Sequence, residues 1–336
     1  MRVLLSCLLL LAFVPGWSGE QRLGLLGRVP QMEARPVTLD PRDPARRRLG
    51  ALTYLGGVSL HSRDPAFGGF SSLVVTGDRF TLLSDGGNVV QFRMGRDWRP
   101  HALRFGNLPA GPSIGWQKQD RDSESLARDP RTGALWVGFE RYNQIWRYAP
   151  DFTRAEGYVA PRAMAGWPRN GGAESLARMP DGRFVTISEE ATATRAERRG
   201  LKIAKKVTRQ GLIFAGDPLR FRPRRFLYQV SSDHDVADAA ALPDGSLIVV
   251  ERRFRLPFRF SNRIMLVPAD EIAPGRLAKG RLLAELDAPL IHDNFEGVAV
   301  TQEDGATMLW LVSDDNQTVL ERSYLLKFRL DARVER

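Results

Sequence analysis

The sequence is poor in cysteine, which forms disulfides, and in histidine, which often acts in catalysis. It holds one cysteine, Cys7, and four histidines among 336 residues. A single thiol cannot form an internal disulfide, so the fold is held together without one. No Gly-x-Ser-x-Gly motif is present, which disfavours an esterase with a serine nucleophile. No zinc-finger spacing, helix-turn-helix or aromatic-rich RNA-binding motif is visible, so we expect no nucleic-acid partner.

Long hydrophobic runs are also missing. The run Val3–Val14 follows Arg2 and precedes the small residues Gly16 and Ser18. Its twelve residues are too few to span a bilayer as a stable anchor. The pattern predicts a signal peptide over residues 1–18, cleaved after Ser18, and a periplasmic or secreted protein with no transmembrane segment afterwards. The mature chain would then contain no cysteine, which suits a bacterial periplasm. A buried N-terminal strand is the alternative reading.

The charge is strongly positive. The net charge is +10, and nearly all of the basic residues are arginine. A basic surface favours anionic lipid or phosphorylated partners, but a solvated surface from an arginine-rich genome explains it equally well. We expect a monomer that binds a small phosphorylated or anionic substrate.

Five similar segments organise the chain. Each opens with a polar or acidic residue, runs through mostly apolar positions, turns at a glycine-containing pair and continues in a second β-rich run that ends on an acidic residue. The segments are 68–87, 122–142, 171–190, 235–254 and 294–316. Their anchors, spaced 50 to 63 residues apart, are Ser71, Glu124, Glu174, Ala237 and Glu296. Further strand-like runs follow each hairpin, and four strands per repeat is the blade of a β-propeller.

The last repeat supplies only three clear strands. The run 50–60 at the other end of the chain can provide the fourth by pairing with 323–330. The sequence therefore predicts an all-β fold, a single β-propeller of five four-stranded blades closed by the N-terminal strand. The expected organisation is a signal peptide (1–18), an N-terminal extension (19–48), the propeller (49–330) and a C-terminal tail (331–336). Six blades, or unrelated hairpins in a β-sandwich, remain as alternatives.

Acidic residues recur at two positions of the repeat. The first strand of a blade starts on the face where the second strand ends, so both positions face one mouth of the channel. The residues that open the first strand are Ser71, Glu124, Glu174, Asp238, which is one position out of register, and Glu296; those that close the second are Asp85, Glu140, Glu189, Glu251 and Asp314. So many carboxylates repel one another unless cations neutralise them. A divalent metal, above all Ca²⁺, or arginine partners would do so. We predict that the acidic residues of this set bind metal.

Basic residues and histidines lie close to these positions. Arg141 follows Glu140, Arg252 follows Glu251, and a basic insert spans 191–209. His292 precedes the first strand of the last repeat. Carboxylates that hold metal, arginines that bind phosphate and a histidine that donates a proton form a set suited to cleaving phosphoesters. Arg141, Arg252 and His292 are thus the predicted catalytic residues. Structural arginine–carboxylate pairing between blades is the alternative.

Three segments carry a resemblance to a known family. DSESLARDPRTGALWVGFERYNQIWRY, DVADAAALPDGSLIVVERRF and HDNFEGVAV resemble the phytase-like family of exported bacterial proteins, described as having esterase-like activity. The resemblance implies a propeller similar in style to the calcium-dependent propeller phytases. By motif it implicates Glu124, Glu140, Arg141, Glu174, Glu189, Asp238, Glu251, Arg252, His292 and Glu296. Ser71 and Ala237 depart from the acidic pattern.

These observations favour a metal-dependent hydrolase, with calcium as cofactor, that acts on phosphoesters or phosphodiesters in the cell envelope. Two alternatives stay open. One is a non-catalytic ligand-binding propeller; the other is a lactonase or carboxylic esterase that uses a metal in the channel.

Overall fold

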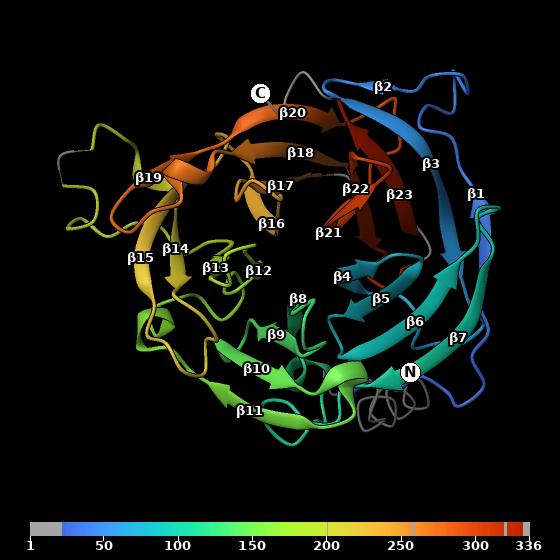
Figure 1. Ribbon diagram of the computed structural model, residues 1–336, viewed down its shortest axis with the longest axis horizontal. Helices are drawn as coiled ribbons and strands as arrows, with labels where there is room; N and C mark the ends of the chain where they lie inside the picture. The colour runs from blue at the N-terminus through green and yellow to red at the C-terminus, as the bar shows by residue number, and fades with distance from the viewer. Residues whose placement is uncertain (1–21, 200, 257–258, 319–320, 332–336) are drawn as a thin grey trace, which may run out of the picture.

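Five sheets surround one central channel in the computed structural model (Figure 1), which describes residues 22–199, 201–256, 259–318 and 321–331. Blade 1 consists of β4 (Phe70–Thr76), β5 (Arg79–Ser84), β6 (Asn88–Met94) and β7 (Pro100–Asn107). Blade 2 consists of β8 (Ser123–Arg128), β9 (Leu135–Phe139), β10 (Gln144–Tyr148) and β11 (Ala155–Val159). Blade 4 consists of β16 (Asp235–Ala241), β17 (Leu247–Arg255), β18 (Arg259–Val267) and β20 (Arg281–Leu286).

The other two blades carry additional strands. Blade 3 contains β12 (Ala177–Arg178), β13 (Phe184–Ile187), β14 (Thr208–Phe214) and β15 (Arg224–Gln229), with β19 (Leu277–Lys279) added in parallel to β15. Blade 5 contains β21 (Asn294–Glu303), β22 (Ala306–Asp314), β23 (Ser323–Leu330) and β3 (Leu52–His61). At the outer edge of blade 5, β3 also pairs with β1 (Glu33–Pro36) and β2 (Arg48–Leu49). The predicted five-bladed, all-β propeller is confirmed.

The innermost strands form the wall of the channel. Each of β4, β8, β12, β16 and β21 contacts the next around the ring, and β21 contacts β4 to complete it. Tight hairpins join the first and second strands of the blades. In blades 3 and 4 the turn is an Asp-Gly pair whose glycine, Gly182 or Gly245, has a φ of 91° or 86°. Only glycine adopts that conformation without strain, which explains the turn signal in the sequence.

A β-bulge interrupts the first strand of most blades at the anchor of the repeat. The pairing of first and second strands slips by one residue at Ser71, Glu124, Ala237 and Glu296. A bulge adds one unpaired residue and redirects side chains locally. These four residues are therefore the extra ones, each at the start of an innermost strand.

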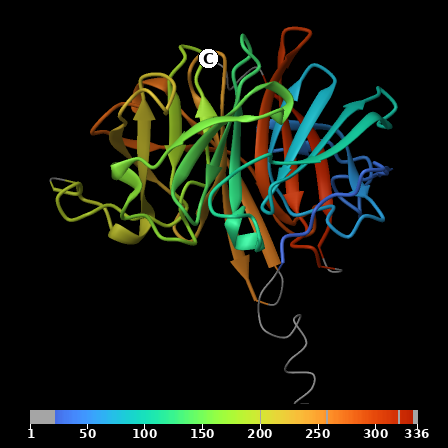
Figure 2. The ribbon, with the colours of Figure 1, turned by 90° about the horizontal axis from the view of Figure 1, so that it is seen from below.

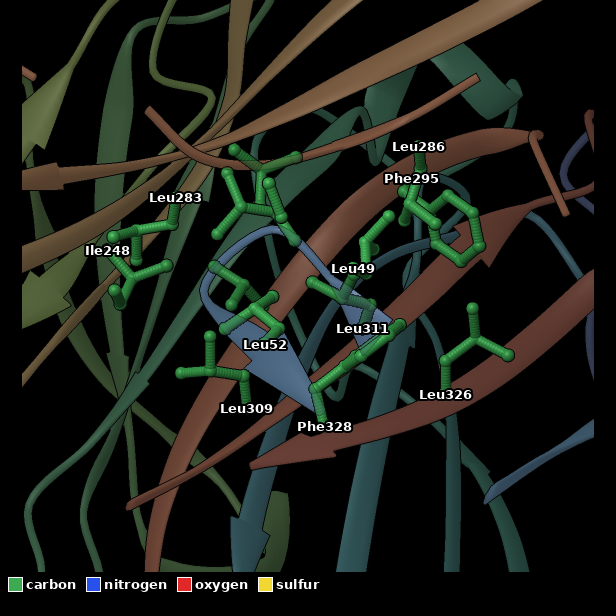
Figure 3. Packing of buried hydrophobic residues seen from close by; sticks show 14 of the residues in the cluster. Leu49, Leu52, Ile248, Leu283, Leu286, Phe295, Leu309, Leu311, Leu326 and Phe328 are labelled. Atoms are coloured by element: carbon green, nitrogen blue, oxygen red, sulfur yellow. The ribbon is translucent and has the colours of Figure 1, made fainter. Parts of the chain in front are cut away.

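The ring closes between the two ends of the chain, as predicted. The strand β3 pairs with β23 in an antiparallel register that runs from Leu60 opposite Ser323 to Leu52 opposite Leu330. A hydrophobic core supports this closure (Figure 3): Leu49 and Leu52 pack with Ile248 and Leu283 of blade 4 and with Leu309 and Phe328 of blade 5. The closing strand thus buries apolar side chains against both neighbours. The strand β1 lies within the predicted N-terminal extension.

Gly57 of β3 provides a test of this closure. A Cβ atom at Gly57 would lie 2.6 Å from the Leu326 side chain and 2.9 Å from the Leu325 carbonyl oxygen. We expect Gly57→Val to lower the free energy of unfolding by about 2 kcal/mol or more and to expose β23 as an unpaired edge that aggregates. Chemical denaturation and light scattering would measure both effects. The matched control is Gly106→Val in β7, where a Cβ meets nothing within 4 Å. Equal stability of the two variants would contradict the prediction.

The predicted signal peptide lies outside the described residues. Within the described part of the chain, no helix has the length and apolar character needed to cross a membrane.

Candidate metal centre

One mouth of the channel opens into a polar cavity of about 420 Å³. The residues that line it are Asp85, Glu124, Glu140, Asn170, Glu174, Glu189, Asp235, Arg252, Phe254, Phe260, Asn294, Glu296, Asp314 and Asn316. A second cavity of about 310 Å³ lies at the far ends of the innermost strands and is lined mainly by Leu, Val, Ala and Pro side chains, without a carboxylate. The chemically active side chains therefore gather at one end of the channel.

Two groups of three carboxylates stand out at this mouth. Asp122, Glu124 and Glu140 each offer one oxygen, and these oxygens lie within 4.8 Å of one another. Glu140, Glu174 and Glu189 form a second group by the same measure. Calcium–oxygen bonds are about 2.3–2.6 Å long, so oxygens on opposite sides of one ion lie about 5 Å apart. The donor set and its spacing fit a hard divalent cation at either group, and Glu140 belongs to both.

A glycine pair of blade 3 fixes Glu140. The backbone N–H groups of Gly171 and Gly172 both donate to its Oε1, Gly172 over 3.1 Å. A Cβ atom at Gly172 would lie 2.9 Å from the Glu140 carbonyl oxygen. The glycines thus allow the backbone of blade 3 to approach the acid of blade 2, and Oε2 of Glu140 forms none of these bonds.

Two cations neutralise one side of the mouth. Arg252 forms ion pairs with Glu189 (2.8 Å) and Glu296, and it donates to Oδ1 of Asn294 (2.8 Å). Lys118 forms an ion pair with Asp85. Asp235 pairs with Arg209 instead. Five other carboxylates at the mouth form no ion pair with a described residue: Asp122, Glu124, Glu140, Glu174 and Asp314. Negative charge is therefore left over in the two carboxylate groups.

The pKa values reflect this excess of negative charge. Burial, reinforced by the neighbouring acids, raises the pKa of Glu124 and Glu174 well above the usual range. Burial together with Glu140 and Asp85 raises the pKa of Asp122 to about 7. Burial also raises the pKa of Glu189 to about 7, although the charge of Arg252 opposes the shift. Without a bound cation, the mouth thus tends to hold protons.

The structure places seven of the ten opening and closing residues around the cavity: Glu124, Glu174, Glu296, Asp85, Glu140, Glu189 and Asp314. Ser71 is buried and donates a 2.6 Å hydrogen bond to the Ser123 carbonyl oxygen. Asp238 accepts hydrogen bonds from the backbone N–H groups of Ala239 and Val298 (2.8 and 2.9 Å). The bulge of blade 4 falls on Ala237, and Asp238, the residue after it, is buried, accepts a further hydrogen bond from Ser72 Oγ (3.4 Å) and does not line the cavity. Glu251 accepts from the Tyr228 hydroxyl (2.7 Å) and the Ser231 N–H.

The predicted catalytic residues are dispersed. Arg252 lines the cavity, whereas Arg141 and His292 do not. The charge of Arg141 partly opposes the rise in the pKa of Asp122. The imidazole Nδ1 of His292 lies 2.7 Å from the Leu290 carbonyl oxygen, at the entry to blade 5. The predicted insert 191–209 reaches into β14, which begins at Thr208, and its described loop residues 191–199 and 201–207 extend outward from the ring at the left of Figure 1.

Several residues of the mouth were not predicted. They are Asp122, Lys118, Asn170, Asp235, Asn294 and Asn316. The sequence pattern could have indicated Asp122, because this residue stands two positions before Glu124 and alternate residues of an extended chain lie on the same side. No repeat pattern could have indicated Lys118, because it lies on the connection between blades 1 and 2, in a 3-10 turn over Lys118–Asp120.

The raised pKa values predict how stability depends on pH. Between their ordinary values near 4 and about 7, the folded protein holds protons on Asp122 and Glu189 that the unfolded chain has lost. Stability in chelator should therefore fall as the pH rises through this window. Calcium should reduce the fall, because it binds the ionised carboxylates. Thermal melts between pH 5 and pH 8 would measure it, and Asp122→Asn should flatten the slope. A melting temperature that rises with pH in chelator would contradict the prediction.

Comparison with known protein families matches residues 65–317 to the Phytase-like family, described as "Esterase-like activity of phytase". The matched range covers well over half of the chain and contains every residue of both carboxylate groups. The chain belongs to the Phytase-like family. For this Phytase-like protein, the family description indicates hydrolase activity on ester bonds.

Among solved structures, a luciferin-regenerating enzyme matches with 10% identity and a TM-score of 0.41, over 78% of this chain and 92% of that chain. The hydrazine synthase of Kuenenia stuttgartiensis matches with 12% identity and a TM-score of 0.38, over 74% of this chain and 77% of that chain. No curated protein matches the sequence. At these scores the structural likeness carries no argument about function.

Proposed function

We propose that this Phytase-like protein is a metal-dependent hydrolase, with calcium as its cofactor, that cleaves phosphoesters or phosphodiesters. The observation that carries the proposal is the pair of carboxylate groups sharing Glu140, whose oxygens lie within 4.8 Å of one another. Buried acids without a paired cation are costly, and a bound divalent ion removes that cost. The family description supports hydrolysis of an ester bond.

The type of donor favours calcium. Both groups offer carboxylate oxygens alone, with neither histidine nor cysteine. Calcium takes six to eight oxygen ligands in flexible geometry, whereas zinc prefers nitrogen and sulfur. Asp122, Glu124 and Glu140 would hold one ion, and Glu140, Glu174 and Glu189 would hold an ion at the second group. When bound, the ion would supply Lewis-acid polarisation of a phosphoryl oxygen.

The protein's own residues would position the substrate. Arg252 directs its guanidinium into the cavity between Glu189 and Glu296, where it can also donate to a phosphate oxygen. The amide of Asn294 holds Glu296 (2.8 Å) and Arg252, which fixes the orientation of both. His292 has no role in this proposal, because it lies outside the cavity lining.

A metal-by-substrate screen tests the proposal. The mature protein is stripped with chelator, and its melting temperature is measured with Ca²⁺, Mg²⁺, Mn²⁺ or Zn²⁺. Hydrolysis is then followed with p-nitrophenyl phosphate, bis(p-nitrophenyl) phosphate, p-nitrophenyl acetate and a γ-lactone. We expect stabilisation by calcium together with cleavage of a phosphate ester. Cleavage of the acetate or lactone alone would indicate a carboxylic esterase. Stabilisation by calcium without any hydrolysis would indicate a ligand-binding propeller.

We also propose that the protein acts in the cell envelope. The apolar run Val3–Val14 and the small residues that follow it support export. Intact-mass measurement of periplasmic protein should show a chain that begins near Gly19. Retention of Met1, or a lipid on Cys7, would contradict the prediction.

A further inference from the structure

One hairpin of blade 4 is longer than its counterparts. The strands β17 and β18 have nine residues each, and their pairing continues past Glu251 to Arg255 opposite Arg259. The equivalent strands of blade 2, β9 and β10, have five residues each and end at Phe139 opposite Gln144. In Figure 2 the β17–β18 hairpin, in orange, extends beyond the body of the ring. The extension therefore rises from the rim of the channel.

The inner side of this hairpin brings an aromatic surface to the mouth. Phe254 and Phe260 both line the acidic cavity, and their ring centroids lie 4.9 Å apart. Phe254 is 48% exposed, whereas Phe260 is buried behind it. All the other described residues that line the cavity are acids, asparagines or Arg252. Neither Phe254 nor Phe260 has a role in the metal binding or the phosphate binding proposed above.

Ion pairs link the hairpin to the neighbouring segments. Arg253 and Arg255 pair with Asp233 at 3.1 and 2.9 Å, and Arg259 pairs with Asp287 at 3.0 Å. At its base, Arg252 is tied to Glu189 and Glu296. Phe254 lies on strand β17 two residues from Arg252, the cation that faces the cavity, and both side chains line the cavity. An exposed ring beside an anion-binding group is suited to a ligand that has both an anionic and an apolar part.

We infer that Phe254, packed against Phe260, determines substrate specificity by contacting an apolar group of the substrate. The substrates are then phosphate esters that carry an apolar or aromatic group. The phosphate would lie towards Arg252 and the carboxylate groups, and the apolar group against the exposed face of Phe254. This inference rests on the proposed function and adds the substrate class. It distinguishes the site from one that selects fully polar esters such as sugar phosphates.

Binding of two phosphonates to the calcium-loaded protein tests the inference without requiring turnover. Phenylphosphonate and methylphosphonate share the anionic group and differ in the apolar one. We expect titration calorimetry to show about tenfold tighter binding of phenylphosphonate, as stacking on one aromatic ring provides. Phe254→Ser should remove this preference. The matched control is Leu256→Ser: Leu256 lies on the same hairpin and is 85% exposed, but it does not line the cavity, so the preference should remain.

Three results would overturn the inference: no preference in the wild type, a preference kept by Phe254→Ser, or equal losses in the two variants. The last would mean that the hairpin tip as a whole is an apolar docking surface, for example for a membrane. The calcium-dependent rise in melting temperature keeps the two proposals apart. If calcium stabilises the protein and methylphosphonate binds, but the preference is absent, the substrate class alone is wrong. If calcium has no effect and neither phosphonate binds, the proposed function is wrong as well.

Discussion

Replacing Glu140 by glutamine should abolish calcium-dependent stabilisation and lower kcat/KM for phosphate-ester hydrolysis at least about 100-fold. Glu140 is the one acid common to both carboxylate groups among the described residues, so its loss affects either ion. The substitution is nearly isosteric. The amide oxygen can still accept from the N–H groups of Gly171 and Gly172, as Oε1 of Glu140 does. The loss of calcium-dependent stabilisation and of activity can therefore be assigned to the lost charge and the lost metal ligand. The stability of the metal-free protein should hold or rise, because one repelling charge is gone.

Glu251→Gln is the matched control for this experiment. Glu251 closes the second strand of blade 4 as Glu140 closes that of blade 2, but it bonds to Tyr228 and Ser231 and does not line the cavity. We expect calcium to stabilise this variant as it stabilises the wild type. Thermal melts in calcium and in chelator, with steady-state kinetics, measure both variants. If Glu251→Gln loses the calcium response and Glu140→Gln keeps it, the assignment of the metal ligands is wrong.

Arg252→Gln should lower the free energy of unfolding of the metal-free protein by about 3 kcal/mol. The arginine is 20% exposed at its side chain and lies between Glu189 and Glu296, which are 15% and 10% exposed. Its removal leaves two buried carboxylates without their shared cation. Calcium should recover part of the loss, because the freed carboxylates can then face a metal ion.

The control for this second variant lies on the same hairpin. Arg255 pairs with Asp233, but the two side chains are 59% and 43% exposed. Exposed ion pairs contribute little, so Arg255→Gln should cost less than about 1 kcal/mol. Urea denaturation in chelator and in calcium compares the two. If both variants lost less than about 1 kcal/mol of unfolding free energy, Arg252 would not be needed to neutralise Glu189 and Glu296.

The sequence allowed the fold to be predicted because the propeller repeats itself. Five hairpins at near-regular spacing, and one strand left over at the N-terminus, were enough to predict the blades and their closure between β3 and β23. The outer additions were not predicted. The strand β19 pairs with β15 from another repeat, and β1 is a four-residue strand in a segment without a repeat signal.

The site was only partly predictable, because the direction of a side chain depends on bulges. Glu124 and Glu296 occupy bulge positions and face the cavity. Asp238 stands one residue after the bulge at Ala237 and bonds to Val298 instead. Since a shift of one residue reverses the face of a strand, an acid near the right position is not sufficient. The role of Arg252 as the partner of two acids from other blades depended on tertiary contacts that no local pattern encodes.

The closure of the ring also determines the order in which the chain can assemble. Leu52 pairs with Leu330, so β3 meets its partner strand β23 only when almost the whole propeller has been synthesised. Contacts between residues so distant in sequence carry a large loop-closure entropy and slow folding. Until then, β3 has only the short strands β1 and β2 to pair with, and its edge towards β23 stays open. We therefore expect the joining of β3 to β23 to be a late step of folding, with the ring held open until the two ends of the propeller meet.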